Sequence, residues 1–412
     1  MSLPFFEEFG WEPVVLAVRP ECIEGVYDRD LEQTIPSHLS ITRIGILPAQ
    51  ISKYFGVRSL SLRCLPSFLW AGDRLLKTQH FDLIYFSTTV FTTMILAARW
   101  RDRFNIPYVL DFQDPWINDY YELANLPPPG GKLKYGFSQM LARRFEPSAV
   151  SQASHILSVS PEYPKTFMQR YPTLDPDKFT VLPFAASERD FDLLPMLNIQ
   201  QSIFDRQDGK KHWVYVGRAG NDIMGFSLRA LFLAIQTLRQ ARPKVWENVE
   251  LHFVGTSYIS ENQVKTVEAI AQEFKVADLV KEYPQRLPYF EALQILSESD
   301  AILLIGSDAA GYTASKIYPC ILARKPILAI FNQQSSVVEV LQRCQAGELV
   351  TFNSNLTPMD LLTEISTKLN WLLSLPPDYL PTTNWEAFQP YTAREMTQKQ
   401  CAIFDRCVSP LP

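Results

Sequence analysis

The stretch HWVYVGRAGNDIMGFSLRALFLAIQTLRQA, residues 212–241, contains three local patterns in succession. The apolar run at 212–217 is typical of a buried strand, and a glycine-containing turn follows it. The apolar residues of 227–241 then recur at the spacing of a helix that packs on one face. A strand joined to a helix by a small-residue turn is the repeating unit of parallel sheets, so the stretch predicts an α/β fold.

The same alternation of strand-like and helix-like runs extends over both halves of the chain. In the C-terminal half, it predicts strands at 249–255, 301–306 and 326–331 and helices at 261–274 and 289–299. In the N-terminal half, it predicts strands at 14–18, 83–87, 108–112, 155–160 and 178–183 and helices at 92–104 and 136–153. A last helix is predicted at 393–408, near the end of the chain. Because the pattern restarts once, we predict two doubly wound, Rossmann-like domains.

The boundaries of these domains follow from a polar, aperiodic segment in the middle of the chain. We predict an N-terminal domain at 1–184, a linker at 185–211 and a C-terminal domain at 212–389. The last segment, 390–412, is predicted to pack back onto the N-terminal domain. Because open parallel sheets bind ligands beyond the carboxyl ends of their strands, we expect the two domains to face a common cleft.

The composition describes a globular chain without a bias towards nucleic acid. The 412 residues are 47% hydrophobic, which is enough for a sizeable core in each domain. Lys and Arg number 39 against 44 for Asp and Glu, so the net charge of -5 gives no reason to expect general affinity for nucleic acid.

Cysteines, histidines and hydropathy add further expectations. The six cysteines form no CxxC pair, which favours reduced thiols in a cytoplasmic protein. The five histidines show no metal-ligand spacing, so no metal site is expected. No apolar run approaches the roughly 18 residues that cross a bilayer, and the N-terminus does not resemble a signal peptide.

Five segments, taken in order, resemble a known family. They are DFQDPW at 111–116, the run from Ala153 to Ala185, WVYVGRAG at 213–220, the run from Tyr283 to Ile305, and YTASKIYPCILARKPILAI at 312–330. This order is similar to that of the bacterial retaining glycosyltransferases of GT-B fold, the "glycosyl transferases group 1" family. The resemblance implies transfer of a sugar from a nucleoside diphosphate sugar to a hydroxyl acceptor, lipid-linked or part of a polysaccharide, with retention and without a metal or other cofactor.

Two loops of the C-terminal half carry the expected contacts with the diphosphate. Gly217 and Gly220 let backbone amides approach a phosphate, and Arg218 supplies a fork of donors that would stabilise the leaving group. In the second loop, Ser315 and the catalytic Lys316 would hold the diphosphate, assisted by Tyr312 and Thr313. The alternatives are an ordinary tight turn in the first loop and helix capping by Ser315 in the second.

Other loops carry the expected contacts with the nucleobase and the acceptor. Arg286 and Leu287 lie where the family binds the base. Four residues on the acceptor side lie at the ends of predicted strands: Asp111, Asp114 in a catalytic role, Ser87 and Thr88. Asp114 precedes a proline and so is also a turn former, while the serine and threonine are also candidates for capping a helix near Val90.

Two departures from the family pattern weaken the expectation of activity. Pro319 and Gly311 stand where relatives carry glutamates, and proline cannot accept a hydrogen bond from the donor ribose. We expect either that a helix begins at Pro319 with Tyr318 as its cap, or that Ser315 caps a helix kinked one turn later. The chain also opens on FFEEFGWEPVVLAV, so the N-terminal domain is expected to lack the family's first strand and its glycine-rich loop, through truncation or loss.

Residues 50–77 combine basic and aromatic side chains in an otherwise acidic chain. Such a stretch is suited to peripheral contact with an anionic membrane at the cytoplasmic face, although a solvated helix face over an apolar stripe has the same composition. Two functional hypotheses therefore stand. One is an active hexosyltransferase-type enzyme, and the other is a catalytically weak relative that binds a nucleotide sugar or partners an active transferase.

Overall fold

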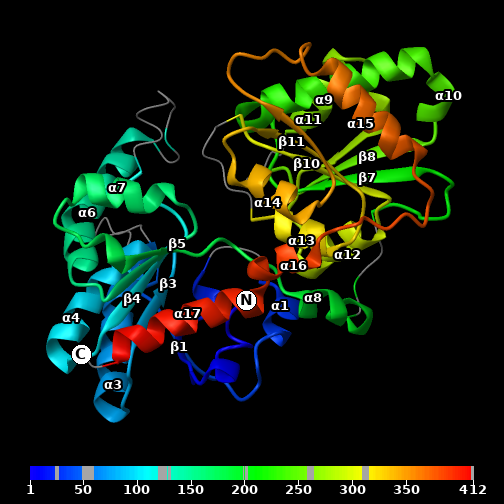
Figure 1. Ribbon diagram of the computed structural model, residues 1–412. Coiled ribbons are helices and arrows are strands. Elements are labelled where there is room, and N and C mark those ends of the chain that lie inside the picture. The colour runs from blue at the N-terminus through cyan, green and yellow to red at the C-terminus, as the bar shows by residue number, and fades with distance from the viewer. Residues whose placement is uncertain are drawn as a thin grey trace. The chain divides into compact units, whose positions relative to one another are not determined.

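The computed structural model describes residues 1–23, 27–48, 60–118, 128, 131–197, 199, 203–257, 264–308 and 315–409. The chain forms two compact units (Figure 1). Unit 1 consists of Met1, 28–34 and 185–393, and unit 2 of 2–27, 35–184 and 394–412. Both units contain parallel sheets with helical connections, which confirms the predicted α/β fold.

Unit 1 contains a six-stranded sheet in the order β12-β11-β10-β7-β8-β9, with every strand parallel to its neighbours. Its strands are β7 (Lys211–Val216), β8 (Val249–Val254), β9 (Val280–Tyr283), β10 (Ala301–Ile305), β11 (Ile327–Asn332) and β12 (Glu348–Phe352). The chain proceeds outward from β7 to β9 and then returns to β10 on the other side of β7. Strand order therefore reverses between β7 and β10, which is the point where doubly wound sheets bind ligands.

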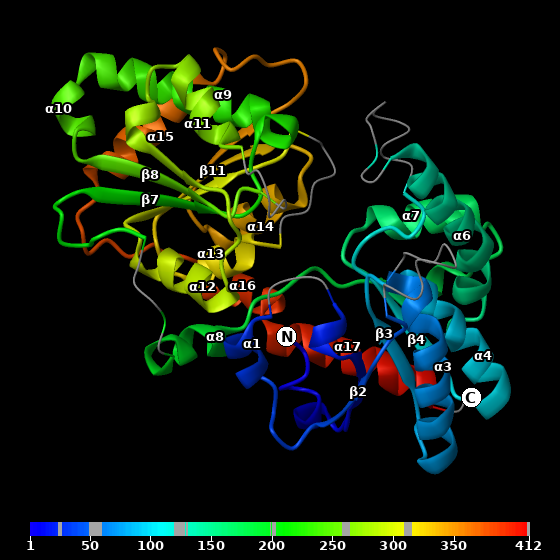
Figure 2. The ribbon, with the colours of Figure 1, turned by 180° about the vertical axis from the view of Figure 1, so that it is seen from behind.

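Helices cover both faces of this sheet because its strands are apolar on both sides (Figures 1 and 2). One face carries α9 (Asn221–Ala241), α10 (Pro243–Trp246), α11 (Thr266–Glu273) and α15 (Leu362–Ser374), and the other carries α12 (Tyr289–Glu298), α13 (Ile317–Leu322) and α14 (Ser336–Cys344). Trp213 and Phe253 pack in the core below α9, whereas Val214 and Val254 contact Ile295 of α12 on the opposite face. The alternation along each strand thus builds two apolar layers.

The remaining elements of unit 1 are short. They are α1 (Arg29–Gln33), α8 (Glu188–Leu193), α16 (Trp385–Phe388) and the 3₁₀ turns η6 (Leu194–Met196), η7 (Ala277–Leu279) and η8 (Gln389–Tyr391). The segment that the sequence assigns to a linker, 185–211, contains α8 and belongs to unit 1. Ala186 forms an isolated parallel bridge with Thr392, and Asp190 Oδ2 accepts a hydrogen bond from Tyr289 Oη at 2.8 Å. These contacts attach the segment to unit 1.

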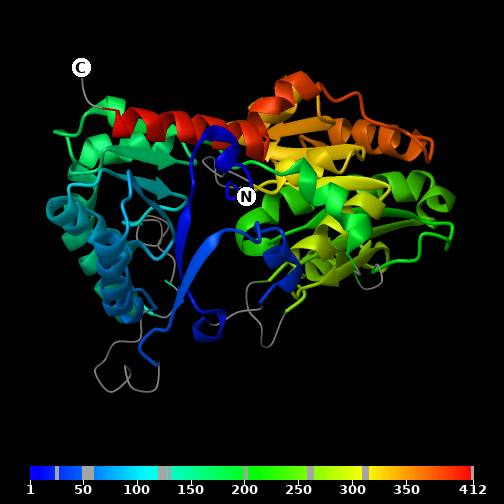
Figure 3. The ribbon, with the colours of Figure 1, turned by 90° about the horizontal axis from the view of Figure 1, so that it is seen from below.

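Unit 2 contains a four-stranded parallel sheet and a separate parallel pair of strands (Figure 3). The four strands, in spatial order, are β3 (Ile84–Ser87), β4 (Tyr108–Phe112), β5 (His155–Ser158) and β6 (Phe179–Val181), and the pair is β1 (Val14–Val18) with β2 (Ser40–Ile44). The strand predicted at 14–18 is therefore present. Among the described residues, however, it pairs only with β2 and does not join the larger sheet.

One face of the four-stranded sheet packs on helices that precede or follow its strands in the sequence. These elements are α3 (Leu60–Thr78), η4 (Phe91–Met94), α4 (Ile95–Phe104), α6 (Lys132–Ser151) and α7 (Glu162–Arg170), with η1 (Glu7–Phe9), η2 (Pro20–Cys22) and η5 (Pro176–Lys178) elsewhere in the unit. Leu110 and Ile156 of the sheet pack with Trp100 and Val150 in this core. No helix of the described residues is long and apolar enough to cross a membrane.

The other face of the sheet packs on the last helix, α17 (Ala393–Val408). Val109 and Leu157, which alternate with the residues of the first core, contact Ile403 and Phe404. The Phe404 ring also lies 6.1 Å from the ring of Phe6, measured between centroids. The helix that ends the described chain and the segment that begins it therefore share one core in unit 2.

Candidate functional site

Four of the predicted diphosphate residues, Gly217, Arg218, Gly220 and Lys316, lie where the strand order of unit 1 reverses. Gly217 directly follows β7 with a φ angle of 130°, and its N–H donates to the carbonyl of Val254 at 2.8 Å. A β-carbon at residue 217 would lie 3.2 Å from Cδ and 3.3 Å from Nζ of Lys316. The glycine therefore serves two purposes: it permits the positive φ angle, and it leaves room for the lysine from the loop after β10.

Lys316 places an amine against an aromatic ring at this point. Its Nζ donates a hydrogen bond to Tyr215 Oη and lies 4.1 Å from the centroid of the Tyr215 ring. The Tyr215 hydroxyl in turn donates to the carbonyl of Arg218 at 2.6 Å, which ties the lysine to the loop after β7. Burial lowers the pKa of Lys316 from 10.5 to about 7, because a charged ammonium loses hydration there. The lysine therefore gains or loses its charge close to neutral pH.

Arg218 is held by its own loop and by the first turn of α9. One terminal nitrogen, Nη1, donates to the carbonyls of Ala219 and, at 3.0 Å, of Thr256. The other, Nη2, donates to Asp222 Oδ2 at 2.6 Å. A β-carbon at Gly220 would lie 2.8 Å from Nη1, so this glycine too makes space for a cationic side chain. The guanidinium is thus fixed beside the turn, as anion recognition requires.

The loop before α13 differs from both geometries expected from the sequence. The cap position of α13 is Lys316, not Ser315 or Tyr318, and its side chain makes no capping hydrogen bond. Pro319 is the third residue of a continuous helix, where backbone N–H groups have no partner within the helix. Proline therefore removes no hydrogen bond here, and neither the late start nor the kink occurs. Ser315 is exposed in the preceding turn, and Gly311, Tyr312 and Thr313 lie outside the described residues.

The loop expected to bind the nucleobase lies beside the end of β8. Arg286 is exposed, and its Cα would lie 3.9 Å from a β-carbon at Gly255, the residue that follows β8. Leu287 is half-buried and packs with Val254 and the neighbouring core residues. Leu287 therefore anchors the loop to the core, and the exposed Arg286 follows the same end of the sheet.

In unit 2, the acceptor-side residues form a network at the carboxyl ends of β3 and β4. Asp111 Oδ2 accepts hydrogen bonds from Tyr85 Oη at 2.8 Å, Ser87 Oγ at 2.9 Å and Gln113 Nε2 at 3.2 Å. Ser87 and Asp111 face each other in the register of the two strands. Burial raises the pKa of Asp111, while the three donors counteract this effect. The network fixes the carboxylate and the serine together.

Thr88 and Asp114 stand outside this network. Thr88 Oγ1 accepts a hydrogen bond from the backbone N–H of Val90 at 2.9 Å, so its hydroxyl closes the local turn before η4. This local role is close to the alternative offered by the sequence, capping of a helix near Val90. Asp114 is exposed, and partial desolvation raises the pKa of its carboxyl group.

Several residues of the site have no signal in the sequence. Tyr215 lies in the middle of an apolar strand and is typical of a core residue, yet its hydroxyl connects Lys316 to the loop of Arg218. Tyr85 of β3 is likewise typical of a core residue, yet its hydroxyl donates a hydrogen bond to Asp111. Only the pairing of strands from distant parts of the chain shows these roles.

Comparison with known proteins matches part of the chain to a glycosyltransferase family model and most of the chain to solved structures of similar fold. Residues 7–185 match the family model of the glycosyl transferase 4-like domain. No curated protein matches the sequence. The GT-B fold predicted from the sequence is confirmed by structures that cover most of the chain.

Three solved structures illustrate the shared fold. The N-terminal domain of Candida albicans trehalose-6-phosphate phosphatase has a TM-score of 0.60 at 13% identity, over 98% of this chain and 93% of that chain. Anabaena HepE, solved in complex with UDP and glucose, has a TM-score of 0.56 at 16% identity, over 94% of this chain and 98% of that chain. A UDP-forming trehalose-phosphate synthase from Burkholderia xenovorans has a TM-score of 0.56 at 13% identity, over 91% of this chain and 90% of that chain. At these identities the similarity concerns the fold.

Proposed function

We propose that the chain transfers a hexose-type sugar from a nucleoside diphosphate sugar to a hydroxyl acceptor, with retention of anomeric configuration. The observation that carries the proposal is the position of Lys316 Nζ against Gly217, at the point where the strand order of unit 1 reverses. Arg218 adds a second cationic side chain on the adjoining loop. The glycosyl transferase 4-like segment supports the reaction class, and the complex of HepE with UDP and glucose supports a nucleotide-sugar donor.

The two cations would act on the leaving diphosphate. In a transfer of this kind, negative charge grows on the oxygen that leaves the sugar, and fixed donors lower the barrier by stabilising it. Lys316, when protonated, would place its ammonium on that charge, and Arg218 would offer its fork of N–H donors in place of the carbonyls it now contacts. The backbone at Gly217 and Gly220 would approach the phosphates. We propose that neither a metal nor another cofactor is needed for this step.

The base and the rest of the donor would occupy the neighbouring loops. We assign the nucleobase to the loop of Arg286, whose Leu287 holds it to the core beside the end of β8. Ser315 is exposed immediately before Lys316 and so is available to a phosphate or a ribose. We include Tyr312 and Thr313 in the same contact on the basis of the sequence alone.

For the acceptor, we propose different roles for the two aspartates of unit 2. Asp111 already receives three hydrogen bonds, so it is suited to positioning the Ser87 hydroxyl and not to abstracting a proton. Asp114 is exposed at the end of the same strand, and its raised pKa makes it the better candidate for contact with an acceptor hydroxyl. Thr88 would serve the fold only, because its hydroxyl closes the local turn.

We further propose a lipid-linked or polysaccharide acceptor, reached from the cytoplasmic side of a membrane. Within α3, Trp70 is 66% exposed and Arg74 lies 5.7 Å from its ring centroid, an arrangement suited to the interface of an anionic bilayer. Residues 50–59 of the basic stretch lie outside the described residues. Sedimentation with vesicles containing phosphatidylglycerol should retain the protein, and Trp70→Ala should weaken this binding; equal binding to neutral vesicles would contradict the assignment.

Pro319 supports a second candidate function. It lies in the first turn of α13, three residues after Lys316, and its side chain offers no acceptor for a donor hydroxyl. A protein that binds a nucleotide sugar without turning it over, alone or as the partner of an active transferase, is consistent with this residue. The variant Pro319→Glu would separate the active transferase from the binding protein. Restoring an acceptor at this position should raise turnover only if the natural chain is a catalytically weakened enzyme.

The decisive experiment is incubation of the full chain with a panel of nucleoside diphosphate sugars. The first proposal predicts both a rise in thermal stability with one member of the panel and release of the nucleoside diphosphate when an acceptor is present. Arg218→Gln should lower both, whereas Arg239→Gln, which removes a surface pair with Asp278 at the far end of α9, should leave both unchanged. Stabilisation without release across acceptors would favour the binding protein, and the absence of both would exclude a donor site here.

A further inference from the structure

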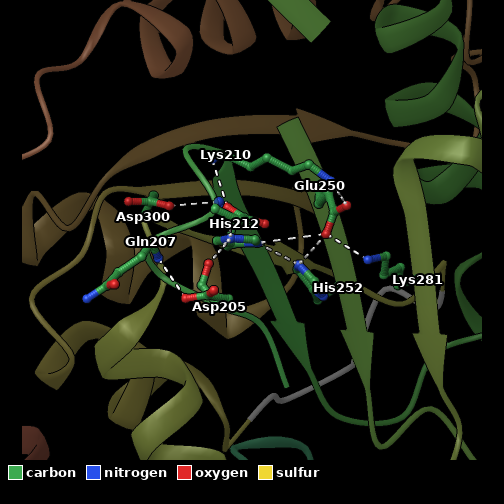
Figure 4. Close-up of polar contacts among 9 residues, drawn as sticks. Asp205, Gln207, Lys210, His212, Glu250, His252, Lys281 and Asp300 are labelled. Atoms are coloured by element: carbon green, nitrogen blue, oxygen red, sulfur yellow. Dashed lines mark hydrogen bonds and ion pairs between the residues drawn. The ribbon is translucent and has the colours of Figure 1, made fainter. Parts of the chain in front are cut away.

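Two histidines and a glutamate lie together on β7 and β8 of the unit 1 sheet (Figure 4). His212 and Glu250 lie near the amino ends of these strands, whereas Gly217 follows the carboxyl end of β7. His212 is the second residue of β7, and Glu250 is its partner in β8. His252 follows Glu250 by two residues and so points to the same face of the sheet. All three side chains are buried, at 1%, 8% and 0% exposure respectively. Within the described residues, no other group of three such potential metal ligands lies this close together.

The three facing atoms have the spacing of ligands around one ion. His212 Nδ1 lies 3.0 Å from His252 Nε2 and 4.0 Å from Glu250 Oε2, and His252 Nε2 lies 3.7 Å from the same oxygen. In a tetrahedral site with bonds of 2.0–2.1 Å, ligand atoms are about 3.3 Å apart. Small rotations of the side chains would therefore bring the triangle to the size that such an ion requires.

The surroundings of His212 direct its Nδ1 lone pair into this triangle. Its other ring nitrogen, Nε2, lies 3.1 Å from Asp208 Oδ1 and 3.2 Å from the carbonyl of Asp205, both of which accept hydrogen bonds. Nε2 therefore carries the proton, which leaves Nδ1 as the unprotonated nitrogen. The ring of Phe204 stacks on the imidazole at 4.4 Å between centroids and fixes its plane. A carboxylate behind a histidine ligand is the usual support of a metal site.

Two lysines contact Glu250, and only one of them would have to move when a metal ion binds. Lys210 Nζ lies 2.5 Å from Oε1, and Lys281 Nζ lies 2.9 Å from Oε2, the oxygen of the triangle. Lys281 is about half exposed, so its ammonium is free to turn into solvent when a dication takes Oε2. Lys210 would keep its contact with Oε1. Lys281 is thus a competitor for the site and not a part of it.

We propose that His212, Glu250 and His252 form a binding site for a zinc-class divalent transition metal ion. Two imidazoles and one carboxylate suit such an ion better than magnesium or calcium, which prefer oxygen ligands. The ion would join β7 to β8 at their amino ends, remote along these strands from Gly217 and Lys316. Its role would be to stabilise unit 1, and the proposal does not depend on the transfer reaction.

The test uses the full chain, stripped of metal with a chelator and then titrated with Zn²⁺, Co²⁺ or Mg²⁺. We expect one Zn²⁺ or Co²⁺ per chain, a rise in Tm, and the visible absorption of tetrahedral Co²⁺, with no effect of Mg²⁺. His252→Gln should abolish the response, while His80→Gln, which removes an exposed histidine, should retain it.

Lys281→Met distinguishes a metal site from a structural cluster if the His252 variant fails to fold. Removal of the competing ammonium frees Glu250 Oε2, so affinity for Zn²⁺ should increase about tenfold or more over that of the natural chain. If the three side chains form only a hydrogen-bonded cluster, neither the natural chain nor Lys281→Met should respond to Zn²⁺. No change in Tm and no Co²⁺ absorption in both the natural chain and Lys281→Met would overturn the proposal.

Discussion

At the scale of single residues, Lys316 combines a binding position with an unusual ionisation. The residue is partly buried, its amine contacts the hydroxyl and ring of Tyr215, and its pKa is lowered to about 7. An ordinary lysine is fully charged at neutral pH, whereas this one exchanges its proton there. The site can therefore hold a partly neutral amine when it is empty and a charged one when an anion binds.

The first prediction concerns stability. Because the folded-state pKa of Lys316 lies below 10.5, the unfolded chain binds more protons between about pH 7 and pH 10, and stability rises with pH over this window. Lys316→Met removes this term, so the variant should be more stable than the natural chain at pH 7, on the order of 1 kcal/mol, with the difference vanishing near pH 10. Urea unfolding across this range measures it.

Lys265→Met is the matched control, because Lys265 forms an exposed pair with Glu268. Its effect on the free energy of unfolding should be small and nearly independent of pH across the same window. If the curves for the natural chain and Lys316→Met run parallel, the ammonium is not penalised by burial.

The second prediction concerns proton uptake on binding and rests on the proposed donor site. A diphosphate beside Lys316 raises the pKa of its amine, so binding near pH 8 should take up close to one proton. Calorimetry in two buffers of different ionisation enthalpy measures this uptake. Arg218→Gln should weaken binding but keep the uptake, whereas Lys316→Met should abolish it. Equal heats in both buffers for the natural chain would place the diphosphate elsewhere.

At the scale of elements, the position of a proline within a helix decides its cost. Pro319 is the third residue of α13, where no intrahelical bond is lost, while Pro66 lies within the nineteen residues of α3. The third prediction is that Pro319→Ala changes the free energy of unfolding by less than about 1 kcal/mol and that Pro66→Ala raises it by about 1–3 kcal/mol. Chemical unfolding of both variants tests this; a large loss from Pro319→Ala would give the proline a structural role of its own.

The sequence predicts those elements whose pattern is strong by itself. Strand β10 is continuously apolar and β4 is apolar apart from Asp111, and both are predicted at nearly their observed bounds, as is α17. In contrast, β2 and β9 have mixed polar sequences, SITRI and VKEY, and were missed, because their strand conformation depends on neighbours and not on local preference. The separation of β1 and β2 from the larger sheet likewise depends on pairing between distant segments.

The same distinction applies to the sites. Glycines and cations after strands are visible in a sequence, so Gly217, Arg218 and Lys316 could be predicted as neighbours. The cluster of His212 and His252 could not, since forty positions separate them and only the register of β7 with β8 brings them together. No spacing rule for metal ligands detects partners from two strands joined by a long helical connection.

At the scale of the whole molecule, unit 2 depends on both ends of the chain. The Phe404 ring of α17 lies 5.3 Å from that of Trp11 and 5.1 Å from that of Tyr85, and it is nearly fully buried. The fourth prediction is that Phe404→Ala lowers the free energy of unfolding of unit 2 by about 3–5 kcal/mol. Leu133→Ala, at a side chain that is 93% exposed, should change it by less than about 0.5 kcal/mol.

Hydrogen exchange resolved by segment provides the measurement for Phe404→Ala. Protection should fall at β4 and β5, whose Val109 and Leu157 contact α17, and stay unchanged at β7 and β8 of unit 1. A uniform loss over both units would show that they unfold together, and no loss in either would remove α17 from the core of unit 2.

The position of α17 also determines the order in which the two units can be completed on the ribosome. The strands of unit 2 are translated first, but the helix that covers Val109 and Leu157 is translated only after nearly all of unit 1. The later unit thus has all of its strands outside the ribosome while the earlier one still exposes an apolar face. A nascent chain of this protein therefore carries a sheet with one uncovered apolar face while unit 1 is being synthesised, which makes unit 2 the part that a chaperone would be expected to shield.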